Sequence, residues 1–184
     1  MNDYIKWLLN SRSAPLSLPY FLPNKNATKE ITESVGCFMA AKEIDYPLDK
    51  SIVIVAGDGI APRTGAIFAL YSKAVVHSID PLLRPKAEHQ FQLENIFGYA
   101  KKGEDVKVDC GGKRVLIVLP HSHCPMPEAV KIPFNYSRMD IVNLPCCVPV
   151  PGKFLTKENS ARIYVDKNIL SGKNMIYIWE NYKK

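Results

Sequence analysis

The sequence predicts an α/β domain with a mainly parallel sheet, helices on both faces and an antiparallel hairpin at the C-terminus. The runs 52–56 and 115–119 are short, apolar and rich in β-branched residues, as in strands that are buried on both faces of a parallel sheet, and 139–144 predicts a further strand. Helical or turn-forming segments alternate with these runs, which is typical of an open α/β sheet. Two further strand-like runs, 162–165 and 175–179, are joined by a turn and predict the closing hairpin.

Residues 1–30 predict a short helix followed by an extended arm. Apolar residues between Tyr4 and Leu9 form an amphipathic pattern, and three prolines between positions 15 and 23 interrupt it. We expect this arm to pack on the sheet, with contact to substrate as the alternative or additional role. The segment 28–44 then has its apolar residues near one face and predicts a helix that covers the sheet, with Thr28 as its N-cap.

The most informative segment begins with the first predicted strand. The strand 52–56 leads directly into Gly57-Asp58-Gly59, an apolar helical run follows, and a second strand, 74–79, ends in Asp80. Small residues in such a turn let the backbone approach a ligand closely, and the free N–H groups of the next helix can hold polar groups. An acid after the second strand lies where a ribose diol binds in a nucleotide-binding β-α-β unit.

Each part of this segment also has a simpler interpretation. A glycine pair after a strand is often only a tight turn. Asp58 can face a ligand or cap the following helix, and Asp80, which precedes a proline, can be a cap or a turn former. The order of strand, Gly-x-Gly, helix, strand and acid within about 30 residues favours a nucleotide-type site.

The middle of the chain is less regular. We predict a strand near 93–97, a polar surface connection over the following residues, and then the buried strand 115–119. A short helix with a proline in its first turn is expected around 127–130, before the strand 139–144. The carboxyl ends of parallel strands are where ligands collect in such sheets, so the polar residues that follow these strands are candidates for function.

Length and composition limit the class of protein. At 184 residues and 47% hydrophobic, the chain predicts a single domain spanning 1–184. It contains no run of the roughly 18 to 20 apolar residues that cross a bilayer, and its N-terminus lacks the pattern of a signal peptide, so we expect a cytoplasmic protein without membrane contact. Its five cysteines show no disulfide spacing, and its net charge of +6 favours anionic partners, RNA or DNA foremost.

This order of elements resembles the class I S-adenosylmethionine-dependent methyltransferases over most of residues 50–180. The resemblance implies a Rossmann-like fold, S-adenosylmethionine as cofactor and methyl transfer as activity. It also implies that Gly57-Asp58-Gly59 lies against the methionine part of the cofactor and that Asp80 binds its ribose hydroxyls, and Pro120 completes the expected cofactor-binding residues. The loop departs from the family pattern at Ala56, where an acid is usual, and at Ala61, where a third glycine is usual.

Within that family, the strand ends His121-Ser122-His123-Cys124 and Pro145-Cys146-Cys147 resemble a branch of RNA-methyltransferase-like proteins. Methyl transfer requires alignment of the acceptor and, for a hydroxyl or ring nitrogen, removal of a proton. His121 and His123 are candidate bases, and Cys146 lies where the backbone can orient an acceptor. These three residues are our predicted catalytic residues, with hydrogen-bonded or packed structural roles as the alternatives.

A metal site is the other interpretation of these strand ends. If the strands ending at Leu119 and Leu144 are neighbours, the histidines and cysteines that follow them converge, and thiolate with imidazole suits Zn²⁺. Adjacent Cys-Cys and His-Cys pairs are awkward tetrahedral chelates, so we assign no metal from the sequence.

Three functions therefore follow from the sequence. The first is methyl transfer from S-adenosylmethionine to RNA or a related acceptor. The second is a non-catalytic methyltransferase-like module that binds RNA or a protein, and the third is an NAD-dependent oxidoreductase, although the loop lacks G-x-G-x-x-G. The oligomeric state and the acceptor atom are left open.

Overall fold

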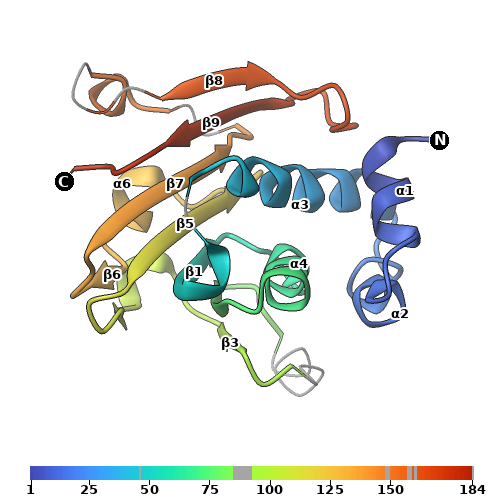
Figure 1. Cartoon of the computed structure of the whole chain (residues 1–184), viewed down its shortest axis with the longest axis horizontal. Coiled ribbons are helices and arrows are strands. Elements are labelled where there is room, and N and C mark those ends of the chain that lie inside the picture. Colours follow the sequence, from blue (N-terminus) through green and yellow to red (C-terminus); the bar gives the residue numbers. More distant parts are fainter. Residues whose placement is uncertain (46, 85–92, 148–149, 157–158, 160, 184) are drawn as a thin grey trace.

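The computed structural model describes residues 1–45, 47–84, 93–147, 150–156, 159 and 161–183. Within these residues the chain forms a seven-stranded sheet flanked by helices (Figure 1) and a separate two-stranded sheet. The order in the large sheet is β3-β2-β1-β5-β7-β9-β8, and the small sheet pairs β4 with β6. The strands are β1 (Ser51–Ala56), β2 (Val75–Ile79), β3 (Ile96–Tyr99), β4 (Val108–Asp109), β5 (Arg114–Pro120), β6 (Pro133–Phe134), β7 (Arg138–Leu144), β8 (Arg162–Val165) and β9 (Met175–Trp179).

The directions of the strands confirm the predicted fold class. Strands β3, β2, β1, β5 and β7 are parallel to one another, whereas β9 is antiparallel to both β7 and β8. The predicted C-terminal hairpin is therefore confirmed, with the bounds that the sequence indicated. Every residue of β1 is buried, as expected for a central strand covered on both faces.

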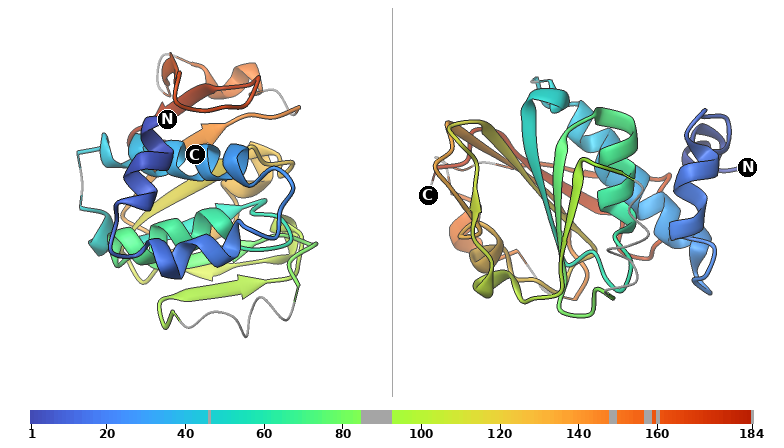
Figure 2. Two further views of the ribbon diagram at one scale, coloured as in Figure 1. Left: turned by 90° about the vertical axis from the view of Figure 1, so that its right-hand side faces the viewer. Right: turned by 90° about the horizontal axis from the view of Figure 1, so that it is seen from below.

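One face of the sheet is covered by long helices. They are α3 (Ala27–Lys42) and α4 (Arg63–Ser72), and α1 (Asp3–Leu9) packs on α3 (Figure 2). Side chains alternate along β1, so Val53 and Val55 meet Phe38 of α3 and Phe68 of α4 in one apolar cluster. The two phenylalanine rings meet edge to face at 5.3 Å between centroids.

The other face is covered by shorter elements. They are α6 (Met126–Ala129), the small sheet and the 3-10 helices η3 (Gly103–Asp105) and η4 (Gly152–Phe154). Met126 and Ala129 of α6 pack in one cluster with Ile54 of β1 and Ile117 of β5. Helices thus lie on both faces, as predicted. A further 3-10 helix, η2 (Leu48–Lys50), leads into β1.

The structure corrects two details at the N-terminus. The expected extended arm instead contains α2 (Ala14–Ser17) and the 3-10 helix η1 (Leu18–Tyr20). A proline in the first turn of each is compatible with helix, because that position needs no N–H donor. Helix α3 begins at Ala27 with Asn26 as its N-cap, so Thr28 lies inside the first turn. Phe21 of this segment is fully buried, and α2 packs against α4.

The middle segment is shifted from its predicted position. The strand expected near 93–97 is β3, Ile96–Tyr99, and its register is set by pairing of Ile96 with Val76 of β2. No helix among the described residues is long and apolar enough to cross a membrane.

Candidate functional site

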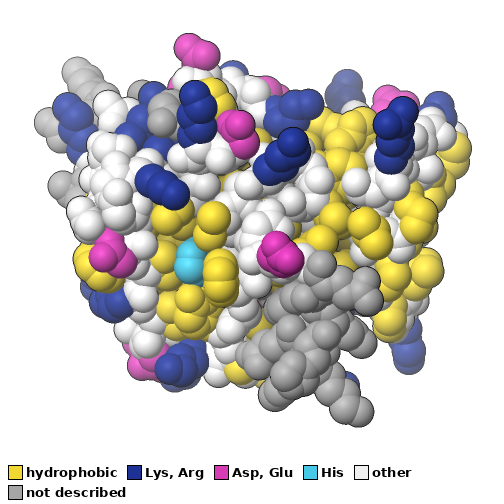
Figure 3. Space-filling model, turned by 60° about the horizontal axis from the view of Figure 1, so that its bottom comes forward, with side chains coloured by type: hydrophobic (Ala, Val, Ile, Leu, Met, Phe, Trp, Pro, Cys, Tyr) yellow, Lys and Arg dark blue, Asp and Glu magenta, His cyan; other side chains and the backbone are white. Residues whose placement is uncertain are grey.

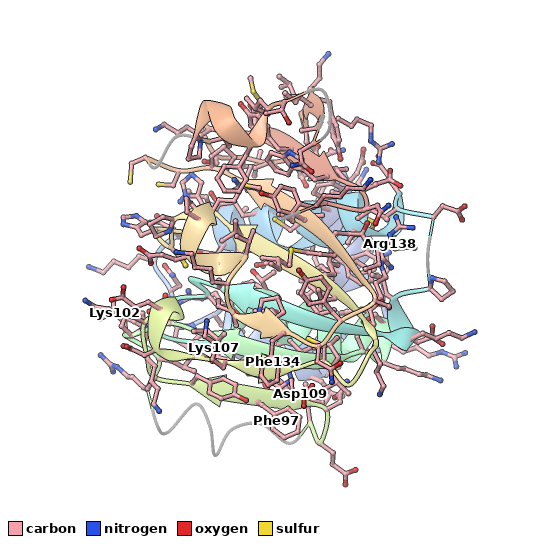
Figure 4. All side chains as sticks on the ribbon, turned by 90° about the vertical axis from the view of Figure 1, so that its left-hand side faces the viewer. Phe97, Lys102, Lys107, Asp109, Phe134 and Arg138 are labelled. Atoms are coloured by element: carbon pink, nitrogen blue, oxygen red, sulfur yellow. The ribbon has the colours of Figure 1, made fainter. Side chains whose placement is uncertain are left out.

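A cavity of about 610 Å³ lies at the carboxyl ends of β1, β2 and β5. Its walls come from the loops after these strands, from α3 and from η3. This is the edge at which open α/β sheets bind ligands. Figure 4 shows Lys102, which lines the cavity, at one end of the sheet and Arg138, which begins β7, at the opposite end.

The glycine loop forms one wall of the cavity. Gly57 and Gly59 have φ angles of +80° and +82°, which L side chains rarely adopt. A Cβ on Gly57 would lie 1.9 Å from Oγ of Ser122. Only glycine therefore allows the loop after β1 to lie this close to the loop after β5, and the contact closes the cavity between the two strands.

The carboxylate of Asp58, in this loop, accepts hydrogen bonds from the first turn of helix α4. Its oxygens accept hydrogen bonds from the backbone N–H groups of Thr64 and Gly65 and from Oγ of Ser78, each at 2.9 Å. Burial raises its pKa to about 6 despite these bonds. Asp58 borders the cavity, but of its two possible roles the described contacts are those of a helix cap.

Asp80 faces the cavity from the end of β2. One carboxylate oxygen accepts from the N–H of Gly59 at 2.9 Å, and the other accepts from the N–H of Leu82 at 2.7 Å. The residue is 9% exposed. Each oxygen has a further lone pair for a ligand hydroxyl, so Asp80 joins the glycine loop to the strand end and can also accept hydrogen bonds from a diol.

Arg63 is a cavity residue that the sequence interpretation did not assign to the site. It begins α4, and its Nη1 lies 3.6 Å from Oε2 of Glu30 on α3. Its Nε is buried and makes no hydrogen bond within the described part of the chain. Because a guanidinium carries five donors, Arg63 retains donor capacity for an anionic ligand group. The two residues come from different helices, so no single motif indicated the pair.

His121 lies where β5 leaves the sheet, in the left-handed region with φ of +53°. Its Nδ1 is 3.5 Å from Oε1 of Glu33, and its Nε2 is 3.4 Å from Oγ of Ser171. Burial, together with the charges of nearby lysines, lowers its pKa to about 4. The imidazole is therefore neutral at pH 7, and its contact with Glu33 is not an ion pair.

Glu33 is the carboxylate opposite His121 in the cavity. Its side chain is 4% exposed, and burial raises its pKa. Its Oε1 is 3.3 Å from Nζ of Lys29, yet this oxygen accepts no hydrogen bond from the residues that the structure describes. The cavity thus presents an acceptor that a ligand N–H or O–H can use.

The remaining predicted residues separate into two groups. Pro120, His123 and Cys124 line the cavity, and burial raises the pKa of the Cys124 thiol to about 12, so that thiol stays protonated at neutral pH. Cys146 lies just beyond the cavity wall, with its Sγ 3.8 Å from Nε2 of His123. The structure therefore groups His121 with Glu33 and His123 with the cysteines after β7.

Comparison with known proteins identifies the fold. No protein-family model matches the sequence, and no curated protein matches it significantly. Among solved structures, MtNAS in complex with MTA and tNA is 12% identical, with a TM-score of 0.53 over 99% of this chain and 70% of that chain. The fibrillarin/Nop5p complex is 8% identical, with a TM-score of 0.51 over 84% and 83% of the two chains.

A third similar structure is that of an S-adenosylmethionine-dependent methyltransferase. A Leishmania major S-adenosylmethionine-dependent methyltransferase is 9% identical, with a TM-score of 0.50 over 97% of this chain and 81% of that chain. The chain therefore has the Rossmann-like fold of the class I S-adenosylmethionine-dependent methyltransferases, as the sequence resemblance implied. The mostly parallel sheet and the antiparallel pair of strands at the C-terminus agree with this fold.

Proposed function

We propose that this chain binds S-adenosylmethionine and transfers a methyl group to RNA. The observation that carries the proposal is the position of Asp80, which faces a cavity of about 610 Å³ and is bonded to the N–H of Gly59. A carboxylate beside a positive-φ glycine loop suits a nucleoside, because it accepts the ribose hydroxyls while the backbone approaches closely. The volume lies within the usual range for small-molecule sites.

The cavity residues fit the cofactor by their chemistry. Asp80 can accept from the two ribose hydroxyls, and the backbone of Gly57 and Gly59 leaves room beside them. Arg63 and Glu30 offer a cation and an anion in one place, which complements the carboxylate and ammonium groups of an amino acid. Solved structures of this fold include MtNAS bound to S-adenosylmethionine, which supports this assignment of the cavity.

When bound, the cofactor supplies a methyl group activated by its sulfonium. The chain then has to align the acceptor and, where the acceptor carries a proton, take up that proton. His123 and His121 are the candidate bases at the cavity wall. His121, neutral with a pKa lowered to about 4, is suited to hold an acceptor by a hydrogen bond, and His123 lies nearer to solvent.

The acceptor is proposed from charge. The net charge of +6 favours a polyanion, and Lys102 stands at the cavity wall. Lys and Arg side chains are spread over the face shown in Figure 3 rather than gathered in one block. The proposed acceptor therefore rests on the net charge and on Lys102 rather than on a basic patch of this face.

One observation favours a binding module that lacks turnover. The glycine loop departs from the family pattern, with Ala56 in place of the usual acid and Ala61 in place of the usual third glycine. The experiment below separates this second candidate function from catalysis.

Calorimetric titration of the whole chain with S-adenosylmethionine, S-adenosylhomocysteine and NAD⁺ tests the cofactor. We expect binding of the first two at micromolar concentration and none of NAD⁺. Incubation with bulk RNA and methyl-labelled cofactor then tests the reaction, and label should enter the RNA. Absence of binding by either sulfur compound overturns the cofactor assignment. Binding without label in RNA favours the non-catalytic module or another acceptor.

A further inference from the structure

Two loops leave the sheet side by side at the rim of the cavity. Strands β5 and β7 are parallel neighbours, and Pro120 pairs with Leu144 in their last register position. The residues that follow these two positions, His121–Cys124 and Pro145–Cys147, therefore lie against each other. The condition for a metal site that the sequence left open, adjacency of these strands, is met.

Three soft side chains of these loops converge. The sulfur atoms of Cys146 and Cys147 each lie 3.8 Å from Nε2 of His123, and the three atoms lie within 4.8 Å of one another. An ion with Zn–S of about 2.3 Å and Zn–N of about 2.0 Å in tetrahedral geometry separates sulfur from nitrogen by roughly 3.5 Å. The observed spacing is therefore close to that of ligands sharing one ion.

The structure answers half of the objection drawn from the sequence. The adjacent His123-Cys124 pair does not have to chelate one ion, because Cys124 is not part of the group. The adjacent pair Cys146-Cys147 is part of it, and the backbone after β7 places both sulfurs at 3.8 Å from Nε2 of His123.

The loop after β7 is held by a contact outside the group. Nζ of Lys173 donates to the backbone carbonyl of Cys146 at 2.6 Å. The lysine therefore ties the loop after β7 to the turn between β8 and β9, and this contact holds the backbone that carries the two cysteines.

We propose that His123, Cys146 and Cys147 bind one Zn²⁺ ion at the rim of the cavity. Two thiolates with one imidazole are a ligand set that zinc prefers, and three protein ligands leave a fourth position for water or another ligand. Both thiols lose their protons on binding. The three ligands are not among the residues assigned to the proposed cofactor. A His123 that binds zinc through Nε2 cannot also take a proton from an acceptor, so this site leaves His121 as the candidate base.

Cobalt titration tests the site. The whole chain, reduced with a phosphine and freed of metal, is titrated with Co²⁺ and then with Zn²⁺, while the thiolate-to-cobalt absorption band is followed. We expect one equivalent of Co²⁺ to produce the band and one equivalent of Zn²⁺ to remove it. Cys146→Ser, Cys147→Ser and His123→Asn should each weaken binding by more than the roughly 10-fold to 100-fold that loss of an outer-shell partner costs.

Cys124→Ser is the matched control. It changes a thiol next to His123 that lies outside the group, and we expect it to bind Co²⁺ like the wild type. Circular dichroism of each variant establishes that it is folded. The proposal is overturned if the folded wild type shows no thiolate band, or if Cys124→Ser abolishes binding while Cys146→Ser and Cys147→Ser leave it intact.

Discussion

Asp58 and Asp80 both follow a strand of the same β-α-β unit, yet their carboxylates have different tasks. Asp58 is buried under α4 and accepts from Thr64, Gly65 and Ser78, whereas Asp80 borders the cavity and accepts from Gly59. The sequence placed both in the site but could not decide between cap and ligand for Asp58. That decision depends on the φ angles of the flanking glycines and on Ser78 of the neighbouring strand.

Asp80→Ala should weaken binding of S-adenosylhomocysteine by about 1 to 3 kcal/mol, because the variant loses the acceptor of two hydroxyls. Calorimetry measures the change. Asp49→Ala is the control, since Asp49 is exposed and lies before β1, at the opposite end of that strand from the cavity. An unchanged affinity in folded Asp80→Ala would contradict the assignment of the ribose site.

Arg63→Ala should separate two ligands that differ in one group. S-adenosylhomocysteine carries an amino acid carboxylate and 5′-methylthioadenosine does not. If the guanidinium binds that carboxylate, the variant loses about 1.5 to 3 kcal/mol with the first ligand and little with the second. Arg84→Ala, which removes a cation exposed beyond the end of β2, is the control.

Comparing the two ligands also distinguishes failure of the cofactor assignment from failure of the role assigned to Arg63. Failure of both to bind the wild type contradicts the proposed cofactor. Equal losses for both ligands in folded Arg63→Ala contradict only the role of Arg63, and indicate that the residue holds the shape of the cavity through Glu30 instead.

At the scale of elements, strong periodicity made the prediction accurate. The hairpin strands 162–165 and 175–179 and the buried strands were placed nearly as observed, because alternating or continuous apolar runs have few other solutions. The prediction of an extended N-terminal arm was wrong, because the prolines that end one helix also fit the first turn of the next. Arg63 and Glu30 were missed for a related reason, because packing of α4 against α3 brings them together.

Helix α4 depends on Asp58, because its N-cap, Pro62, makes no side-chain hydrogen bond to the first turn. Asp58→Asn replaces an acceptor oxygen by an amide that faces N–H donors, so we expect the free energy of unfolding to fall by about 1 to 2 kcal/mol. Urea unfolding followed by circular dichroism measures it. Ser78→Ala removes a single donor to the same carboxylate and should cost less. A larger loss in Ser78→Ala would argue against capping as the main role.

At the scale of the whole molecule, the two ends of the sheet differ. The cavity occupies the carboxyl ends, while Arg114 and Asp140 form a fully buried ion pair near the opposite ends of β5 and β7. Parallel strands and the position of the cavity followed from the sequence. The ion pair did not, because its partners are 26 residues apart and meet only once β5 and β7 are neighbours.

Acid sensitivity is a property of the whole fold, and the half-buried histidines His77 and His121 contribute to it. Burial lowers the pKa of His77 and of His121 to about 4 from 6.5, so each stabilises the fold above pH 6.5 and loses that contribution as the pH falls toward 4. Asp58 and Glu33 act in the opposite sense, because burial raises the pKa of both, that of Asp58 to about 6 from 3.8, and their contributions are lost as the pH rises. The change in stability between pH 6.5 and 4.5 is therefore the difference between two histidines and two carboxyl groups, and a variant that lacks one histidine isolates its part.

His77→Asn tests this balance. His77 stacks on Phe97 and its Nδ1 lies 3.0 Å from the hydroxyl of Tyr99, and an asparagine keeps a polar group near that hydroxyl without titrating. Between pH 6.5 and 4.5 the variant should lose less stability than the wild type, by on the order of 1 to 2 kcal/mol, as measured by urea unfolding at both pH values. Tyr99→Phe removes the same hydrogen bond but keeps the imidazole, so its loss should equal that of the wild type. If His77→Asn and the wild type lose stability equally, the acid sensitivity of this fold comes from other groups.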